Sequence, residues 1–299
     1  MTEENNRKEG VILKGIGGFY YILSDGEVYE TRARGRFRKD GITPMPGDRV
    51  ILSLPTDQVG GYVEEILERK NALPRPMVAN VEQLMIVCAA KAPAPDLMLV
   101  DKLLLYARFC RVKPVLVINK TDQDPTLAEK TAEEYRAADV EVLTVSAQEK
   151  MGLDAIESLL RGKTTCLSGQ SAVGKSSLLN ALCPSLDLKT GGLSKKTARG
   201  KHTTRHSELM YIKELDAAVI DTPGFSILEV MDIEPEELKD LYPEFRDVQC
   251  RYGGRCLHDR EPECGAKAKL KKRELSKGRY ERYLLLLQEL KERKDKKYD

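Results

Sequence analysis

Residues 169–176 have the spacing of a phosphate-binding loop. The run Gly169-Gln170-Ser171-Ala172-Val173-Gly174-Lys175-Ser176 matches the pattern G-x-x-x-x-G-K-[ST]. Its glycines let backbone N–H groups turn toward a phosphate chain, and the positive end of a following helix adds to the field. Lys175 can neutralise charge on the β- and γ-phosphates, and Ser176 can offer its hydroxyl to Mg²⁺. The pattern predicts phosphoryl-transfer chemistry on a nucleoside triphosphate.

Two further motifs would select the base. Asn119-Lys120-Thr121-Asp122 is an N-K-x-D sequence. The carboxylate of Asp122 can accept hydrogen bonds from guanine N1–H and the exocyclic amine, a pair of donors that adenine lacks. Lys120 can lay its stem across the base, and Asn119 can tie the loops together. Ser146-Ala147 fits the companion loop whose backbone N–H meets guanine O6, so we expect GTP rather than ATP.

The segments that would sense the γ-phosphate follow later in the chain. Asp221-Thr222-Pro223-Gly224 is a D-x-x-G motif that places a carboxylate near Mg²⁺ and the Gly224 N–H against the γ-phosphate. Thr203 and Thr204 lie in a loop rich in glycine, lysine and threonine, which we expect to close over the metal. Ser176, Thr204 and Asp221 are the predicted magnesium ligands.

Catalysis of hydrolysis needs a group that orients the attacking water. Many GTPases carry glutamine directly after D-x-x-G, but this chain has Phe225, which cannot do so. His202 is the candidate substitute, acting with Lys175 and Thr204. We therefore expect slow intrinsic hydrolysis and strong stimulation by a partner.

A cluster near the C-terminus has the composition of a metal site. Cys250, Cys256, His258 and Cys264 offer three thiolates and one imidazole within 15 residues, which is the ligand set of a closed structural zinc site. All four ligands would be protein atoms, so the predicted zinc is not catalytic.

The elements that must position these motifs alternate between apolar strands and helices. We expect strands at 83–89, 114–118, 140–145, 164–167, 208–212 and 217–220, and helices at 97–110, 126–138, 152–160 and 175–182. This alternation predicts an α/β domain with a mostly parallel sheet covered on both faces.

The order of the motifs differs from that of an ordinary small GTPase. There the phosphate loop comes first and the base-reading loops last, whereas here N-K-x-D and S-A precede the phosphate loop. The domain is therefore predicted to be circularly permuted, with D-x-x-G near its C-terminal end. We expect loss of the γ-phosphate to be transmitted into the C-terminal domain.

Two segments flank the α/β domain. Short runs at 11–13, 19–23, 28–31 and 49–52, separated by glycine-containing turns, predict a small N-terminal β-barrel. Beyond residue 230 we expect helices that start at Pro235 and at Lys267, the second running to Lys291. The predicted domains are 1–72, 73–230 and 231–299.

Composition and charge exclude several classes. The longest apolar run, 84–90, is far too short for a membrane span, and the polar residues 1–8 contain no signal-peptide core. Seven cysteines, an odd number, argue against a disulfide framework. We expect a cytoplasmic monomer without membrane contacts.

Positive charge gathers in two places. Residues 267–299 contain 13 basic and 6 acidic residues, and arginines and a lysine crowd 32–39, which we expect to form a loop of the barrel. Both patches fit a polyanionic partner.

The complete set of motifs resembles the ribosome small-subunit-dependent GTPase A family (RsgA). The resemblance covers nearly the whole chain, and it implies an N-terminal OB-fold, GTP hydrolysis stimulated by the 30S subunit, binding to 16S rRNA and a role in late small-subunit maturation. It also implies that Asn119–Asp122 and Gly169–Ser177 hold GTP or GDP. The Cys/His cluster is implied to hold zinc. The run 200–204, G-K-H-T-T, resembles the family's G-R-H-T-T with lysine for arginine, and Ala172 stands where the family usually has glycine.

Two other readings remain open at this point. A permuted GTPase of large-subunit assembly would share the motif order, but the barrel and the Cys/His cluster argue against it. An RNA-binding scaffold that keeps GTP only as a structural ligand is the other alternative.

Overall fold

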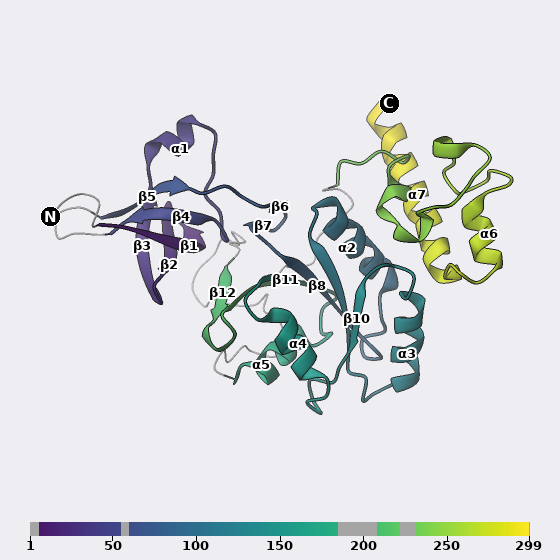
Figure 1. The fold of residues 1–299 in the computed structure, drawn as a ribbon, viewed down its shortest axis with the longest axis horizontal. Helices are drawn as coiled ribbons and strands as arrows, with labels where there is room; N and C mark the ends of the chain where they lie inside the picture. The colour runs from purple at the N-terminus through teal and green to yellow at the C-terminus, as the bar shows by residue number, and fades with distance from the viewer. Residues whose placement is uncertain (1–5, 55–59, 185–207, 222–230, 299) are drawn as a thin grey trace.

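The computed structural model describes residues 6–54, 60–184, 208–221 and 231–298. Figure 1 shows a barrel at one end, a sheet with helices in the middle and a helical C-terminal region at the other end. Within the described ranges, no helix combines the length and the apolar character needed to cross a membrane.

The N-terminal barrel is closed by five strands in the order β1-β2-β3-β5-β4. The strands are β1 (Arg7–Ile16), β2 (Phe19–Ser24), β3 (Glu27–Ala33), β4 (Arg49–Ser53) and β5 (Gly61–Ile66). Alternate residues point inward, so Ile12, Ile22 and Val63 are fully buried in a core of the barrel's own. The predicted barrel is confirmed, and β5 is a strand that the sequence analysis missed.

The basic segment 32–39 is not the loop that the sequence predicts. Strand β3 extends to Ala33, and Gly35–Lys39 forms the short helix α1, whose Phe37 is buried in the barrel core. Phe37 explains the difference, because one apolar side chain among the basic residues holds the segment against the barrel.

A hairpin joins the barrel to the rest of the chain. Strands β6 (Ala72–Pro74) and β7 (Met77–Ala79) pair antiparallel. The N–H of Ala79 donates to the carbonyl of Pro46 (2.8 Å), and the amide of Asn80 donates to that of Gly47 (2.8 Å). The approach is so close that a Cβ on Gly47 would lie 2.1 Å from the oxygen of Ala79.

The central sheet has six strands in the order β10-β9-β8-β11-β13-β12. These are β8 (Gln83–Ala89), β9 (Lys113–Asn119), β10 (Glu141–Thr144), β11 (Thr164–Ser168), β12 (Leu209–Ile212) and β13 (Ala217–Asp221). All six predicted strands are present; β12 alone runs antiparallel to its neighbour. The chain fills one half of the sheet outward from β8 and then returns to β11 at the centre. This is the permuted arrangement that the motif order predicts.

Helices cover both faces of the sheet. Helix α2 (Leu97–Phe109) and helix α3 (Pro125–Glu134) lie on one face, and α4 (Leu153–Leu160) and α5 (Lys175–Leu182) lie on the other, each face with its own apolar core. Asp96 and Asp124 begin the first two helices by accepting hydrogen bonds from the N–H of Leu99 and Leu127.

The C-terminal region packs on the α2 face, with helix α7 (Lys277–Tyr298) beside α2 (Figure 1). The helix expected from Pro235 is wrong: turns lead into the 3-10 helices η4 (Leu238–Leu241) and η5 (Pro243–Phe245). Pro243 lacks an N–H and favours an extended residue before it, and Tyr242 is extended at φ −105°.

The single helix expected over 267–291 is two helices, α6 (Gly265–Lys271) and α7. Helix α6 ends where Arg273 adopts φ +60°, while the N–H groups of Arg273 and Glu274 donate to the carbonyls of Leu270 and Lys269. This is a Schellman ending, usually built on glycine, so the sequence does not reveal it. The short 3-10 turn η6 (Gly253–Arg255) precedes α6.

Candidate functional site

The predicted nucleotide motifs follow the carboxyl ends of neighbouring parallel strands. Asn119 ends β9, Gly169 follows β11 and Asp221 ends β13. Ser146 follows β10 two residues after its end. Parallel strands present their carboxyl ends at one edge of a sheet, and ligands bind there, where the direction of strand addition reverses. That reversal lies here between β8 and β11.

The phosphate loop has backbone geometry that its sequence requires. Gly169 has φ +141°, and a Cβ there would lie 2.0 Å from the carbonyl oxygen of Val87 in β8. Ala172 has φ +64°, in the left-handed region that costs a residue with a side chain roughly 1 to 2 kcal/mol. Ser171 and Ala172 are exposed, while Val173 is buried in the core beneath α5. The loop therefore exposes Ser171 and Ala172 to solvent and is anchored in the core by Val173.

Lys175 and Ser176 open helix α5. The Nζ of Lys175 donates to the carbonyls of Gly169 (2.9 Å) and Gln170 (3.1 Å), which closes the loop on its own lysine. Ser176 is buried and Ser177 half-buried in the first turn. The side-chain oxygen of Gln170 is buried and accepts no hydrogen bond within the described residues.

Asn119 and Lys120 connect the base-reading loop to the phosphate loop. The Asn119 amide donates to the carbonyl of Val173 (2.9 Å), and its oxygen accepts from the N–H of Ala147 (3.1 Å). The Nζ of Lys120 donates to the carbonyl of Ala172 (2.8 Å) and to that of Ala92. Asn119 thus joins three of the predicted segments, as the sequence analysis expects.

The carboxylate of Asp122 is held by Ser146. The Ser146 hydroxyl, fully buried, donates to Oδ1 of Asp122 at 2.5 Å and accepts from the N–H of Glu149 at 3.0 Å. The loop that carries Ser146 is itself pinned by paired backbone hydrogen bonds with Met151. One carboxylate oxygen of Asp122 therefore has a fixed partner, which orients the group.

Other predicted residues lie outside the described residues. These are His202, Thr203, Thr204 and Gly224, together with Phe225. Asp221 is described only as the last residue of β13. The roles assigned to these residues in magnesium binding and in water activation stay predictions.

The Cys/His cluster has the dimensions of a tetrahedral metal site. Nδ1 of His258 lies 3.6 Å from Sγ of Cys250, 3.4 Å from that of Cys256 and 3.3 Å from that of Cys264. The four ligand atoms lie within 4.8 Å of one another. Zinc bonds of 2.3 Å to sulfur and 2.0 Å to nitrogen imply ligand separations of about 3.5 to 3.8 Å in a tetrahedron. These four residues can hold a metal ion, and the three sulfurs fit zinc.

The surroundings of the cluster fix the ligands. Burial, with a smaller contribution from Lys239, lowers the pKa of His258, so its ring is neutral at pH 7 and can offer a lone pair. The N–H of Gly265 donates to Sγ of Cys250 (3.2 Å). Glu261 accepts from the N–H groups of Leu257 and Asp259; burial raises the pKa of its carboxyl, but these bonds lower it overall.

Helix α7 holds the cluster from the other side. The hydroxyl of Tyr280 donates to the carbonyl of His258 (2.7 Å), and that of Tyr283 donates to the carbonyl of Leu257 (2.6 Å). Tyr280, Tyr283 and Leu287 of this helix are buried and Leu284 is partly buried, so its apolar residues at i, i+3, i+4 and i+7 pack on the core.

A buried charge cluster was missed by the sequence analysis. Asp101 of α2, fully buried, accepts from Arg279 (2.5 Å) and Arg282 (2.5 Å) of α7, and Arg279 also pairs with Glu244 (2.7 Å). Burial lowers the pKa of Arg279, but Asp101 and Glu244 outweigh it, so the pKa lies above the ordinary value of arginine. The one available signal was a lone carboxylate among the leucines of 97–105.

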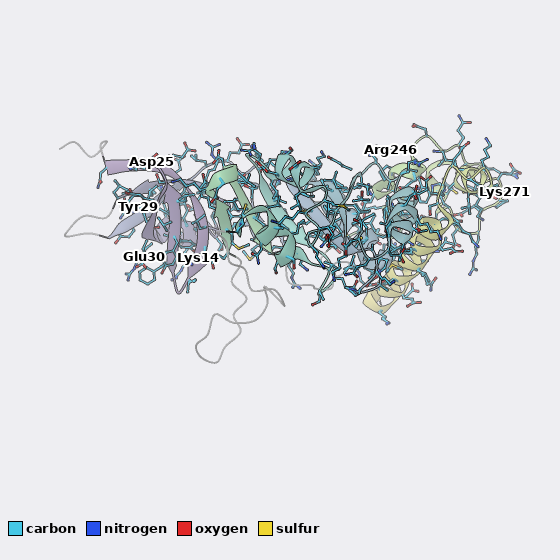
Figure 2. The ribbon with its side chains drawn as sticks, turned by 90° about the horizontal axis from the view of Figure 1, so that it is seen from below. Lys14, Asp25, Tyr29, Glu30, Arg246 and Lys271 are labelled. Carbon is cyan, nitrogen blue, oxygen red and sulfur yellow. The ribbon has the colours of Figure 1, made fainter. Side chains whose placement is uncertain are left out.

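Charged side chains lie at both ends of the molecule, and at the barrel end they lie beside aromatic rings. Figure 2 shows Lys14, Tyr29 and Glu30 at the barrel end and Arg246 and Lys271 at the opposite end. On the barrel, arginines lie over aromatic rings, Arg32 over Phe19 (4.6 Å to the ring centre) and Arg34 over Tyr62 (4.0 Å). Such pairs suit a surface that meets nucleobases and phosphates.

Known proteins are similar to this chain over nearly its whole length. The model of the RsgA GTPase family matches residues 66–231, and that of the RsgA N-terminal domain matches residues 9–63. A protein of Geobacillus kaustophilus named small ribosomal subunit biogenesis GTPase RsgA is 45% identical over 292 residues, which span 96% of this chain and 98% of that protein. A protein of the same name from Ruminiclostridium cellulolyticum is 43% identical over 288 residues, 95% of this chain and 94% of that protein.

Solved structures are similar as well. YjeQ from Thermotoga maritima superimposes with a TM-score of 0.81 at 35% identity, covering 95% of this chain and 98% of YjeQ. YloQ, described as a circularly permuted GTPase, superimposes with a TM-score of 0.78 at 36% identity, covering 98% of each chain.

Proposed function

The chain belongs to the RsgA GTPase family, and from this premise we propose that it hydrolyses GTP while assisting late maturation of the small ribosomal subunit. The observation that carries the proposal is the convergence of the base-reading and phosphate loops at one sheet edge, joined through Asn119. The names of the relatives point to the same process.

GTP is the substrate that the site residues suit. We assign the base to Asn119, Lys120, Asp122, Ser146 and Ala147, and the phosphates to residues 169–177. The hydrogen bond from Ser146 supports this assignment, because it leaves Asp122 one oxygen with a set orientation toward a base. A base without paired donors would leave that carboxylate unsatisfied, which is costly in a confined site.

Hydrolysis needs Mg²⁺ beside the phosphates. Ser176, buried at the start of α5, has the hydroxyl and the position to help hold it. When bound, the ion neutralises charge that develops on the phosphate oxygens. Lys175 adds a second positive charge once its Nζ turns from the loop carbonyls to the substrate. Thr203, Thr204, Asp221 and Gly224 complete the assignment.

Stimulation by a partner follows from the residue after D-x-x-G. Phe225 cannot orient water, so His202 is assigned that task, and contact with the 30S subunit brings it into place. Loss of the γ-phosphate then drives release of the protein from the subunit.

The 16S rRNA is the proposed partner surface. The cation–aromatic pairs of the barrel and the basic C-terminal region lie at opposite ends of the molecule (Figure 2). Both ends can therefore contact one large RNA at the same time. Such binding weakens as salt rises, because phosphate contacts release counterions.

Zinc is the metal that we propose for the Cys/His cluster. Its three sulfurs and neutral imidazole, all within 4.8 Å of one another, form a ligand set that suits zinc. The ion would stabilise the loop 250–264 and take no part in hydrolysis. Metal analysis of the purified protein should find about one zinc per chain, and its absence would contradict this assignment.

The decisive experiment is GTP turnover with 30S subunits, 50S subunits, 70S ribosomes and no ribosome. We expect strong stimulation by 30S alone. Equal turnover without ribosomes, or stimulation by 50S, would refute the proposal. Lys175→Ala should abolish turnover and 30S release, with Lys163→Ala, a lysine just before β11, as the matched control.

A further inference from the structure

Helix α2 stands between the base-reading loop and the C-terminal region. Its N-terminal end follows the segment 90–96, and Ala92 in that segment accepts the Nζ of Lys120. The N–H of Ala90 also donates to the carbonyl of Asn119 at 2.8 Å. The start of α2 is thus attached to the motif assigned to the guanine base.

The other attachment of α2 is the buried charge cluster. Asp101 lies five residues after the cap Asp96, and Arg279 and Arg282 of α7 hold both of its oxygens. The hydroxyl of Tyr135, at the end of α3, donates to Asp101 at 2.7 Å. Outside this cluster, Lys102 pairs with Glu289 of α7 at 3.0 Å.

These contacts bind α2 and α7 to each other. Opening the cluster would leave a charge with zero exposure uncompensated, which costs far more than opening an exposed ion pair. Helix α7 in turn holds the Cys/His loop through Tyr280 and Tyr283. Helix α2, 13 residues and about 20 Å long, therefore links the base-reading loop to α7, which in turn holds the metal-binding loop.

We propose that binding of a guanine nucleotide stabilises the docking of α7 on α2, and that this docking in turn strengthens nucleotide binding. This inference rests on the proposed guanine site. A bound base covers the stem of Lys120 and holds its Nζ on Ala92, which fixes the segment 90–96 and the start of α2. This coupling depends on whether the base site is occupied, so GDP and GTP should produce it equally. It differs in this from the effect expected through D-x-x-G, which depends on the γ-phosphate.

Coupling of this kind is reciprocal. If nucleotide stabilises the docked α7, the docked α7 must strengthen nucleotide binding by the same factor. A variant that loosens α7 from α2 should therefore bind GDP more weakly, although the change lies far from every residue assigned to the nucleotide.

The test measures amide hydrogen exchange in the full-length, metal-loaded protein without nucleotide, with GDP and with a non-hydrolysable GTP analogue. In the wild type, both nucleotides should slow exchange in α2 and α7 several-fold. In Arg282→Met this protection of α7 should disappear, and GDP affinity by calorimetry should fall roughly five-fold, the lower end of typical coupling.

Lys294→Met is the matched control. Lys294 lies on the same helix and pairs with the exposed Glu234 (2.8 Å), not with a residue of α2, so the response of the wild type should be retained. Arg282→Lys, which keeps one charge but not the forked geometry, gives a milder version should Arg282→Met fail to fold.

Two results would overturn the proposal. One is α7 exchange that GDP leaves unchanged, including the case in which only the GTP analogue protects it. The other is an Arg282 variant that responds as the wild type does. A chain that binds no guanine nucleotide in calorimetry would instead refute the proposed function, so the two failures are distinguishable.

Discussion

The barrel and the C-terminal region are joined to the central sheet in different ways. The barrel has a core of its own, and it meets the rest through hydrogen bonds to the β6–β7 hairpin and Asn80, through the partly buried Val11 and Leu13, which pack on the main core, and through an exposed ion pair, Lys14–Glu208. The C-terminal region shares one continuous core with the α2 face of the sheet and adds the buried charges around Asp101. The second joint is therefore the more deeply buried of the two, and it makes the C-terminal region part of the GTPase body.

Metal removal should produce the largest difference in stability between the C-terminal region and the barrel. Zinc contributes on the order of 10 kcal/mol to the folding of small zinc modules, and the loop it would hold here supports α7. Chelation should lower the melting temperature and speed hydrogen exchange in α7 and α2, while exchange in the barrel stays unchanged. Cys256→Ser should reproduce the effect and Cys110→Ser, outside the cluster, should not. Equal loosening of the barrel would contradict the contrast between the joints.

Breaking the buried charge cluster should come next. Arg279→Met leaves Asp101 and Glu244 buried with fewer counter-charges, so the free energy of unfolding should fall by about 3 to 5 kcal/mol in urea denaturation. The same substitution at Arg49, whose pair with Glu9 is half exposed, should cost less than about 1 kcal/mol. Similar losses of unfolding free energy at the two positions would show that burying an ion pair does not increase its contribution to stability.

A smaller effect should come from the hairpin joint. Gly47→Ala places a Cβ 2.1 Å from the oxygen of Ala79 at φ +85°, whereas Gly26→Ala has nearly the same φ, +82°, and nothing within 4 Å. Both should lose roughly 1 to 2 kcal/mol to backbone strain, and Gly47→Ala should lose more and loosen the barrel. Equal costs in urea denaturation would mean that the hairpin yields easily to the barrel.

The exposed ion pair should matter least. Lys14→Met removes the partner of Glu208, and the expected loss is below about 1 kcal/mol and disappears at high salt. Thermal denaturation at low and high salt measures it. A loss above 2 kcal/mol, insensitive to salt, would make this contact a principal support of the barrel.

Sequence reasoning located the elements of the central sheet because apolar strands and capped helices alternate there with clear punctuation. It failed where tertiary contacts decide local structure. Phe37 turns a basic loop into a helix, and Arg273 ends α6 in a conformation that sequences usually mark with glycine. Strand β5 was missed because it follows a run of residue types common in turns.

The candidate sites also differ in how far sequence could predict them. The Cys/His cluster and the phosphate loop each come from a short stretch of chain, so spacing alone predicted both. The bond between Ser146 and Asp122 joins segments 24 residues apart, and that between Asp101 and Arg279 spans 178. Pairings at such separations depend on the completed fold, which no local pattern encodes.

The position of β12 at the end of the sheet has a consequence for association between chains. An end strand carries unpaired N–H and carbonyl groups that can recruit a strand from another molecule. Strand β1 of the barrel lies against β12 (Figure 1). The barrel therefore covers this end strand against edge-to-edge aggregation, and a chain shortened to begin after residue 66 would lose that protection together with the surface proposed to contact RNA.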